Sequence, residues 1–237
     1  MNPNEQRETE VSRIRGVYAK RRIELSAGRY SLFSCDNSLR YVQLVEEMAK
    51  LMRRFECTRL DDKKIVDVGC GTGFWLRELI QFGATPKNLF GVDLLEERVE
   101  KARELCPPLT TLMCSDASRL DFEDSSFDLI LQFTVFTSIL DPGMKRKVAT
   151  EMARVLRKGG AILWYDYFVS NPQNPDVRGV SRREICELFP DLSVYLRRIT
   201  LAPPIGRAIA PVAPSIYYLL SRCKPLCTHY LGFLVKA

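Results

Sequence analysis

A short stretch near the middle of the first half of the chain carries residue types that could bind a nucleoside. Glycines alternate with other residues at Gly69, Gly71 and Gly73, so the backbone can turn sharply and no side chain blocks a ligand. Asp67 stands just before this loop. A carboxylate there would repel a pyrophosphate but would favour a ligand that carries an ammonium or sulfonium group. The pattern therefore favours a cationic nucleoside.

The spacing of the glycines also differs from that of a dinucleotide-binding loop. That fingerprint is Gly-x-Gly-x-x-Gly or Ala, because a small third residue lets the helix pack closely. In this chain Phe74 holds the third position. NAD is therefore a poorer fit than a cationic nucleoside.

The elements that position this loop follow from the spacing of apolar residues. The segment 65–68 predicts a short buried strand before the loop. Residues 74–82 have apolar side chains at helical spacing, and Gly83 stands where that helix would end. Strand, glycine loop and helix N-terminus together form the arrangement that binds nucleotide-like ligands in a doubly wound sheet.

Several motifs, in chain order, resemble those of the class I S-adenosylmethionine-dependent methyltransferases. The run Asp-Val-Gly-Cys-Gly-Thr-Gly at 67–73 looks like their first motif almost letter for letter. Four further motifs match in order. The motifs at 91–94 (Gly-Val-Asp-Leu) and 114–117 (Cys-Ser-Asp-Ala) stand at the ends of the second and third expected strands. The motif at 127–132 (Phe-Asp-Leu-Ile-Leu-Gln) forms the fourth strand, and the one at 156–163 (Leu-Arg-Lys-Gly-Gly-Ala-Ile-Leu) leads into the fifth. The resemblance is close over about residues 40–168 and loose elsewhere.

The resemblance and the alternation of strands and helices imply an α/β fold. We expect a doubly wound, mostly parallel, seven-stranded Rossmann-like sheet with a C-terminal antiparallel hairpin and an inserted lid. The chain would form one domain, 1–237. Within it we expect an N-terminal helical cover at 1–55, a cofactor-binding core at 60–168, and C-terminal strands at 169–237 with the lid at 202–228.

Periodicity and capping residues set the expected boundaries of the other elements. Residues 1–10 are polar, and we expect disorder at their tip. We expect helices at 11–25, 96–105 and 182–189, the last capped by Ser181. A further helix would start at a cap formed by Asp36 or Asn37 and run to about residue 54. Another would run from 142 to 157 and be ended by Gly159-Gly160. We expect strands at 88–93, 110–114, 127–133, 161–168, 193–201 and 229–235.

Polar residues at the ends of the second and third strands are the expected contacts to the nucleoside. The Asp93 carboxylate can accept both ribose hydroxyls at the carboxyl edge of the sheet, although an isolated aspartate is more often a surface turn. Asp116 can accept from the adenine amine while the Ala117 N–H meets a ring nitrogen, with an Asx turn as the alternative. Leu94 would lie against adenine. Arg98 would stack there, or be a solvated helix arginine.

The remaining contacts concern the methionine part and the cover of the site. Gln132 and Phe133 would line the methionine moiety, partly through backbone carbonyls, or serve as core packing. Tyr18 and Tyr30 lie in the N-terminal segment that covers the cofactor in the family, and seating that segment on the core is an equal alternative. Asp67 would orient the loop and the amino group. The full expected cofactor set is Asp67, Gly69, Cys70, Gly71, Gly73, Asp93, Leu94, Arg98, Asp116, Ala117, Gln132, Phe133 and Tyr18.

Methyl transfer from a sulfonium mainly requires the acceptor to be held near an already activated donor in a dry pocket. A general base helps only if the acceptor must lose a proton. The candidates are Asp166, Tyr165, Tyr167 and His229; a structural role is the safer interpretation for His229, and no catalytic residue is assigned. The Asn-Pro-Pro-Tyr motif of amino-methylating nucleic-acid enzymes does not follow the fourth strand at 132–136, which argues against base N-methylation.

Composition is that of an ordinary reduced, cytoplasmic protein. The length of 237 residues suits one domain with a sizeable core. The eight cysteines include no Cys-x-x-Cys pair, and there is one histidine, so we expect free thiols and no metal site. We expect no signal peptide, because the N-terminal residues are polar and charged. The apolar run at 208–220 contains two prolines and is shorter than the ~20 residues of a transmembrane segment.

The expected partners are S-adenosylmethionine, with S-adenosylhomocysteine as product, and a small-molecule or glycan or lipid-precursor acceptor. The Pro-rich, apolar insertion suits a bulky acceptor; Arg207, Arg222 and Lys224 flank it and also allow peripheral contact with a membrane surface, but an ordinary pocket cover is the preferred interpretation. The net charge of +6 does not demand nucleic acid. An RNA or protein methyltransferase, with basic clusters at 20–22, 145–147 and 197–198, and a non-catalytic binding protein are the alternatives. Oligomeric state stays open.

Overall fold

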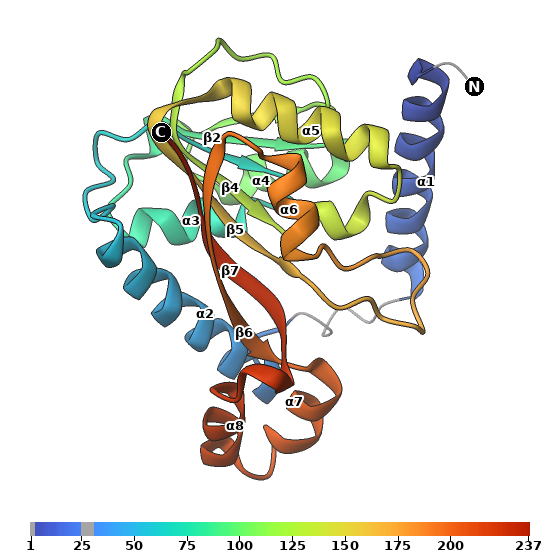
Figure 1. Cartoon of the computed structure of the whole chain (residues 1–237), viewed down its shortest axis with the longest axis vertical. Coiled ribbons are helices and arrows are strands. Elements are labelled where there is room, and N and C mark those ends of the chain that lie inside the picture. The colour runs from blue at the N-terminus through green and yellow to red at the C-terminus, as the bar shows by residue number, and fades with distance from the viewer. Residues whose placement is uncertain (1–2, 25–30) are drawn as a thin grey trace.

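Seven strands form one sheet in the part of the chain that the computed structural model describes, residues 3–24 and 31–237 (Figure 1). They are β1 (Ile65–Val68), β2 (Leu89–Asp93), β3 (Thr111–Cys114), β4 (Phe127–Phe133), β5 (Leu156–Tyr167), β6 (Leu192–Leu201) and β7 (Cys227–Lys236). Their order is β3-β2-β1-β4-β5-β7-β6. The strands from β3 to β5 are parallel, and β7 is antiparallel to both of its neighbours. This confirms the predicted mostly parallel sheet with a C-terminal antiparallel hairpin.

Helices cover both faces of this sheet (Figure 1). They are α1 (Pro3–Glu24), α2 (Cys35–Arg54), α3 (Phe74–Gln81), α4 (Glu96–Leu105), α5 (Pro142–Val155), α6 (Arg182–Leu188), α7 (Pro203–Ile209) and α8 (Pro214–Ser221). Short 3-10 turns lie at η1 (Pro86–Asn88), η2 (Phe136–Ser138) and η3 (Lys224–Leu226). No helix among the described residues combines the length and apolarity that crossing a bilayer requires.

Each strand in the middle of the sheet is buried on both faces. In β1, Ile65 packs in the layer with α2 and α3, while Val66 and Val68 pack in the layer with α1, α5 and α6. Because both faces need apolar side chains, such strands read as continuous apolar runs in the sequence. This is why β1 and β4 were predictable from the sequence.

The boundary between α5 and β5 differs from the prediction. The helix begins as expected, because the Asp141 carboxylate accepts from Met144 N at 2.6 Å. It ends at Val155, and Gly159 and Gly160 lie inside β5, where the pairing with β4 shifts register. A Cβ on Gly160 would come within 2.9 Å of the Asp128 carbonyl oxygen. The two glycines therefore form a bulge in a strand, and the prediction that they end the helix was wrong.

The N-terminal helices also differ from their predicted boundaries. Helix α1 begins at Pro3, so the expected start at residue 11 was wrong. Helix α2 begins after Ser34, and Asp36 and Asn37 lie in its first turn, so neither is the cap. The Asp36 carboxylate instead accepts from the Ser34 hydroxyl at 2.6 Å.

The insertion between β6 and β7 contains α7 and α8, which project from one end of the molecule (Figure 1). Leu201, Ala210 and Tyr217 form a small separate core there, against which Leu39 of α2 packs. Strand β6 ends and β7 begins beside the carboxyl end of β5, since Tyr167 is paired with His229. The insertion therefore sits at the carboxyl edge of the parallel strands.

Candidate functional site

The glycine loop joins β1 to α3 at the carboxyl edge of the sheet, and its three glycines serve different purposes. All three have positive φ, at +79° for Gly69, +55° for Gly71 and +73° for Gly73. A Cβ on Gly69 would collide with Val135, and one on Gly73 with Cys106. At Gly71 the nearest atom is Arg98 Nη1, at 3.7 Å. Packing thus requires glycine at 69 and 73, whereas a side chain at 71 would enter the crevice over the loop.

The backbone N–H groups of this loop donate to protein acceptors. Those of Gly69 and Cys70 both donate to the Val92 carbonyl, at 2.7 and 3.0 Å. The Gly71 N–H donates to Asp93 Oδ2 at 2.8 Å, and the Gly73 N–H donates to the Cys70 carbonyl at 2.9 Å. Phosphate-binding loops instead point such N–H groups at the anion. The hydrogen bonding here does not suit a pyrophosphate.

The Asp67 side chain is enclosed beneath the loop. It is 2% exposed, and Oδ2 has no hydrogen-bond partner among the described residues. Burial, and to a lesser degree the Asp93 carboxylate, raises the pKa of Asp67 to about 8. An unpaired buried carboxylate is costly, and a cation nearby relieves that cost. Asp67 therefore fits a ligand that carries an ammonium or sulfonium group.

Asp93 ends β2 and faces the loop from the neighbouring strand. Its Oδ2 accepts from Gly71 N, and its Oδ1 accepts from Leu95 N at 3.0 Å. Each carboxylate oxygen has a second lone pair, so the group can fix the loop and still accept from a ligand. The predicted contact to ribose hydroxyls is compatible with this geometry and stays a prediction.

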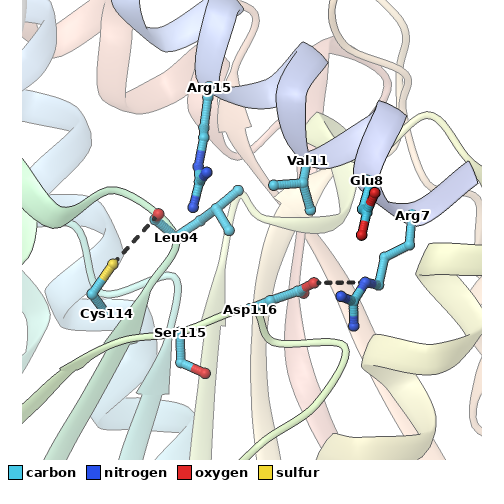
Figure 2. A pocket seen from close by; sticks show the side chains of 8 residues that line it. All are labelled: Arg7, Glu8, Val11, Arg15, Leu94, Cys114, Ser115 and Asp116. Atoms are coloured by element: carbon cyan, nitrogen blue, oxygen red, sulfur yellow. Dashed lines mark hydrogen bonds and ion pairs between the residues drawn. The ribbon is translucent and has the colours of Figure 1, made fainter. Parts of the chain in front are cut away.

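A cavity of about 330 Å³ lies beside the ends of β2 and β3. Figure 2 shows side chains of α1 pointing into it from one side and residues of the sheet edge facing them. Its lining consists of Arg7, Glu8, Val11, Arg15, Leu94, Cys114, Ser115 and Asp116. Two of the residues predicted to contact adenine, Leu94 and Asp116, are thus brought together, while Ala117 packs against the core nearby.

Asp116 makes the Asx turn that the sequence also allowed. Its Oδ1 accepts from Ser118 N at 2.8 Å. Its Oδ2 lies 3.7 Å from Arg7 Nε of α1 (Figure 2). The carboxylate therefore faces the cavity with one oxygen in a turn and the other near a cation. An adenine amine is a donor that would compete with Arg7 for this second oxygen.

Arg98 lies between the loop and α1. Its guanidinium stacks over the Tyr18 ring at 4.4 Å, and its Nη1 is the atom nearest to the open side of Gly71. Arg98 therefore stacks on an aromatic ring of this chain, as its planar group allows. Tyr30, the other aromatic residue expected over the site, lies outside the described residues.

Gln132 and Asp166 are buried on the α5 face of the sheet and hold the loop that follows β4. Gln132 Oε1 accepts from Val135 N at 3.1 Å, and its Nε2 donates to Asp166 Oδ2 at 3.3 Å. Asp166 Oδ2 also accepts from Thr137 N at 3.2 Å. The Gln132 side chain is fully buried and both of its polar atoms are engaged within the protein, so its predicted contact to a ligand would be through the backbone carbonyl. Val135, in the same loop, packs on Gly69.

Of the other groups considered as bases, Tyr165 and His229 are buried, while Tyr167 is half-buried. Tyr165 packs in the opposite layer against Phe133, with ring centroids 5.5 Å apart. His229 stacks on Tyr165 at 4.8 Å, and burial followed by the Arg40 charge lowers the pKa of His229 to about 3. A histidine with so low a pKa is a weak base. Burial raises the pKa of Asp166 to about 7, but its two oxygens already accept the hydrogen bonds described above and one from Tyr167 N.

Helix α1 is attached over the site mainly by polar contacts, which the sequence did not predict. Glu10 Oε1 accepts from Leu140 N at 2.6 Å and Asp141 N at 3.3 Å. Arg13 donates to the Ser138 carbonyl at 2.6 Å. The spacing of Arg7, Val11 and Tyr18 places them near one side of a helix, a signal that would have been visible had the helix been extended through the polar segment 1–10.

We expect Glu10→Ala to loosen α1 without unfolding the core. Only a small apolar part of α1 is buried, chiefly Ile14, so its attachment relies on the two N–H groups that Glu10 caps. Amide hydrogen exchange in α1 should accelerate, while exchange in β1 and β4 stays slow. Glu100→Ala, an exposed change on α4, is the control and should leave α1 protected. Unchanged protection of α1 in Glu10→Ala would contradict this role.

Comparison with known proteins finds methyltransferases that are similar to part of this chain. Residues 65–160 match the family model of a methyltransferase domain. Phosphatidylethanolamine N-methyltransferase of Cereibacter sphaeroides is 32% identical over 106 residues, which cover 44% of this chain and 51% of that enzyme. A tRNA N(3)-cytidine methyltransferase of Gallus gallus is 31% identical over 113 residues, covering 44% of this chain and 30% of that enzyme. A SAM-dependent methyltransferase structure from Methanosarcina mazei has a TM-score of 0.54 at 19% identity and covers 76% of this chain and 95% of that one.

These matches cover only part of this chain and of its relatives. This chain spans about half, or less, of the length of the curated relatives named above. The family match begins at β1 and ends within β5, so it contains the glycine loop, Asp93 and Asp116. The segment with α6, α7 and α8 lies outside it. The similarity therefore concerns the part of the fold that contains the glycine loop and the ends of β2 and β3.

Proposed function

We propose that this chain is a Rossmann-like, S-adenosylmethionine-dependent methyltransferase that transfers a methyl group from S-adenosylmethionine to a small-molecule acceptor. The observation that carries the proposal is the buried Asp67 carboxylate, whose Oδ2 has no hydrogen-bond partner among the described residues, beneath a loop whose N–H groups donate within the protein. Together they favour a cationic ligand and disfavour a phosphate. The product would be S-adenosylhomocysteine.

We propose that the residues of the crevice divide the binding of the donor between them. Asp67 faces the charged amino acid end, Asp93 the ribose, and Leu94 and Asp116 the base. When bound, S-adenosylmethionine supplies a methyl group that is already activated by its sulfonium. The side chains we describe then have to orient the reactants and exclude water, and α1 contributes by covering the crevice.

We propose that the acceptor is a small molecule or a glycan or lipid precursor. The relatives act, by name, on a phospholipid in one case and on tRNA in another, so the acceptor has to be argued from the segment they do not share. That segment is Pro-rich and apolar around α7 and α8. Such a surface suits an apolar acceptor better than a polyanion.

The basic clusters that would support RNA binding are partly neutralised within the fold. Lys145 is 1% exposed and pairs with Glu184 at 3.0 Å. Arg197 pairs with Glu47 at 2.7 Å. Engaged cations of this kind contribute little to phosphate binding. A salt-sensitive shift of the chain with RNA would favour the RNA alternative.

We also propose that the protein works in the cytoplasm. Its eight cysteines are all free and dispersed, which suits a reducing compartment. Fractionation of the source cells, with the chain detected by antibody, tests this location.

Turnover of a labelled donor tests the proposed reaction. The full chain is incubated with methyl-labelled S-adenosylmethionine and fractionated metabolite, glycan-precursor, lipid and RNA pools. We expect label to enter a lipid or glycan-precursor fraction. Label in RNA would overturn the acceptor class, and donor binding without transfer to any pool would indicate a non-catalytic binding protein.

Replacing Asp93 tests its assigned contact to the donor. We expect Asp93→Ala to weaken S-adenosylmethionine binding by ~1–3 kcal/mol, the scale of losing charge-assisted hydrogen bonds. Asp93→Asn keeps one acceptor oxygen and should lose less. Asp62→Ala, an exposed aspartate with its side chain 63% accessible, is the control. Calorimetry that finds wild-type affinity in Asp93→Ala would remove the assignment.

A further inference from the structure

The segment 212–220, which leads into and through most of α8, contains both covered and exposed apolar side chains. Tyr217 and Leu220 pack in the small core formed with α7, β6 and α2. Ile216 and Leu219 of α8, and Val212 in the turn before it, face solvent instead. Large apolar side chains are more often buried, so this exposed group lacks the cover that its composition calls for.

This outer stripe, which we define as Val212, Ile216 and Leu219, is solvent-exposed. The three side chains are 80%, 50% and 70% exposed. Exposed apolar residues on monomers are usually isolated, whereas these three lie close together in the sequence, in α8 and the turn before it. Helix α8 lies in the part of the molecule that projects from one end (Figure 1).

Exposed cations lie in the same insertion as the outer stripe. Residues 192–237 contain six lysines and arginines and no aspartate or glutamate, and the nearby acids belong to α2, where Glu47 pairs with Arg197 and Glu46 interacts with Arg222. Three of the cations, Arg207, Arg222 and Lys224, are exposed in the insertion itself. Exposed apolar residues with exposed cations in the same segment fit a surface that is apolar below and anionic above.

We propose that the outer stripe docks onto an anionic lipid bilayer, with Arg207, Arg222 and Lys224 at the headgroups. A second copy of this chain fits less well, because pairing the same surface would bring six cations together. The insertion sits at the carboxyl edge of the sheet, next to the end of β5 and the start of β7. Docking would therefore turn the crevice toward the bilayer and bring it within reach of an acceptor held in the membrane. This last step rests on the function proposed above.

Vesicle flotation of the full chain tests the proposal. We expect binding to vesicles of phosphatidylcholine with phosphatidylglycerol, and little binding to phosphatidylcholine alone. Leu219→Gln should weaken binding to anionic vesicles about tenfold. Leu109→Gln is the matched control, because Leu109 is 68% exposed but lies elsewhere, and it should bind as the wild type does. Arg222→Gln with Lys224→Gln should weaken binding by about fivefold for each charge.

The outcomes separate this proposal from the proposed reaction. Leu219→Gln should bind S-adenosylmethionine in calorimetry as the wild type does, because Leu219 lies outside the crevice. The calorimetry therefore tests the proposed reaction, and the flotation tests the proposed docking, independently of each other. Absence of flotation at low salt, or equal flotation of Leu219→Gln and Leu109→Gln, would overturn the proposal. A dimer in light scattering that Leu219→Gln dissociates would overturn it in favour of a second copy.

Discussion

Gly71→Val is expected to abolish S-adenosylmethionine binding while the chain stays folded. Gly71 has φ +55°, and only Arg98 Nη1, at 3.7 Å, lies near its missing Cβ. The valine would therefore enter the crevice where we propose the donor lies. The folded state should lose about 1–3 kcal/mol from the backbone conformation alone. Titration calorimetry and thermal unfolding measure the two effects separately.

Gly83→Val is a matched control for this prediction. Gly83 has φ +94° and no atom within 4 Å of its missing Cβ, so valine there meets backbone strain but no neighbour. It follows α3 and is remote from the crevice. We expect a similar loss of stability with unchanged affinity. Normal binding by Gly71→Val, or equal loss of binding in both variants, would show that the loop does not hold the donor.

Asp67→Asn is expected to stabilise the ligand-free protein at high pH and to weaken donor binding. The pKa of Asp67 rises from 3.8 to about 8 on folding, so the folded state holds the proton more tightly than the unfolded state. Stability of the wild type therefore falls as the pH rises from about 4 to about 8. At pH 9 the variant should be more stable by ~3 kcal/mol, the scale of an unpaired buried charge.

The affinity for the donor should change with pH in the opposite direction. Binding of a cation favours ionised Asp67, so the wild-type affinity should rise with pH up to about pH 8. The affinity of Asp67→Asn should be lower at pH 9 and nearly independent of pH. Asp61→Asn, with a side chain 59% exposed, should behave as the wild type. The pKa of Asp67 lies within the range from about pH 6 to about pH 9. A wild-type affinity that stays constant across this range would contradict the role of Asp67.

The central sheet was predictable because its signals are local. The strands around Val66 and Ile130 are buried on both faces, and the loop between β1 and α3 is specified by glycines that packing requires at 69 and 73. Helix α4 was predicted to its last residue, Leu105, because prolines follow it closely in the sequence. In each case the local preference and the tertiary structure agree.

The parts that were not predictable depend on distant contacts. Helix α1 is polar, and its position is set by Glu10 and Arg13 binding the backbone of a loop more than a hundred residues away. The glycine pair in β5 resembles a helix end in sequence, but pairing with β4 makes it a bulge. The exposure of the outer stripe could not be read from periodicity, since exposed Ile216 and Leu219 each stand next to a covered apolar residue in the sequence.

One titration tests the central claim most directly. The full chain is titrated calorimetrically with S-adenosylmethionine, S-adenosylhomocysteine and NAD at the same concentrations. A sulfur nucleoside site predicts heat of binding for the first two ligands, lost in Gly71→Val, and none for NAD. Saturable binding of NAD, with neither sulfur nucleoside competing, would contradict the claim that the crevice between β1 and α3 accepts a cationic nucleoside.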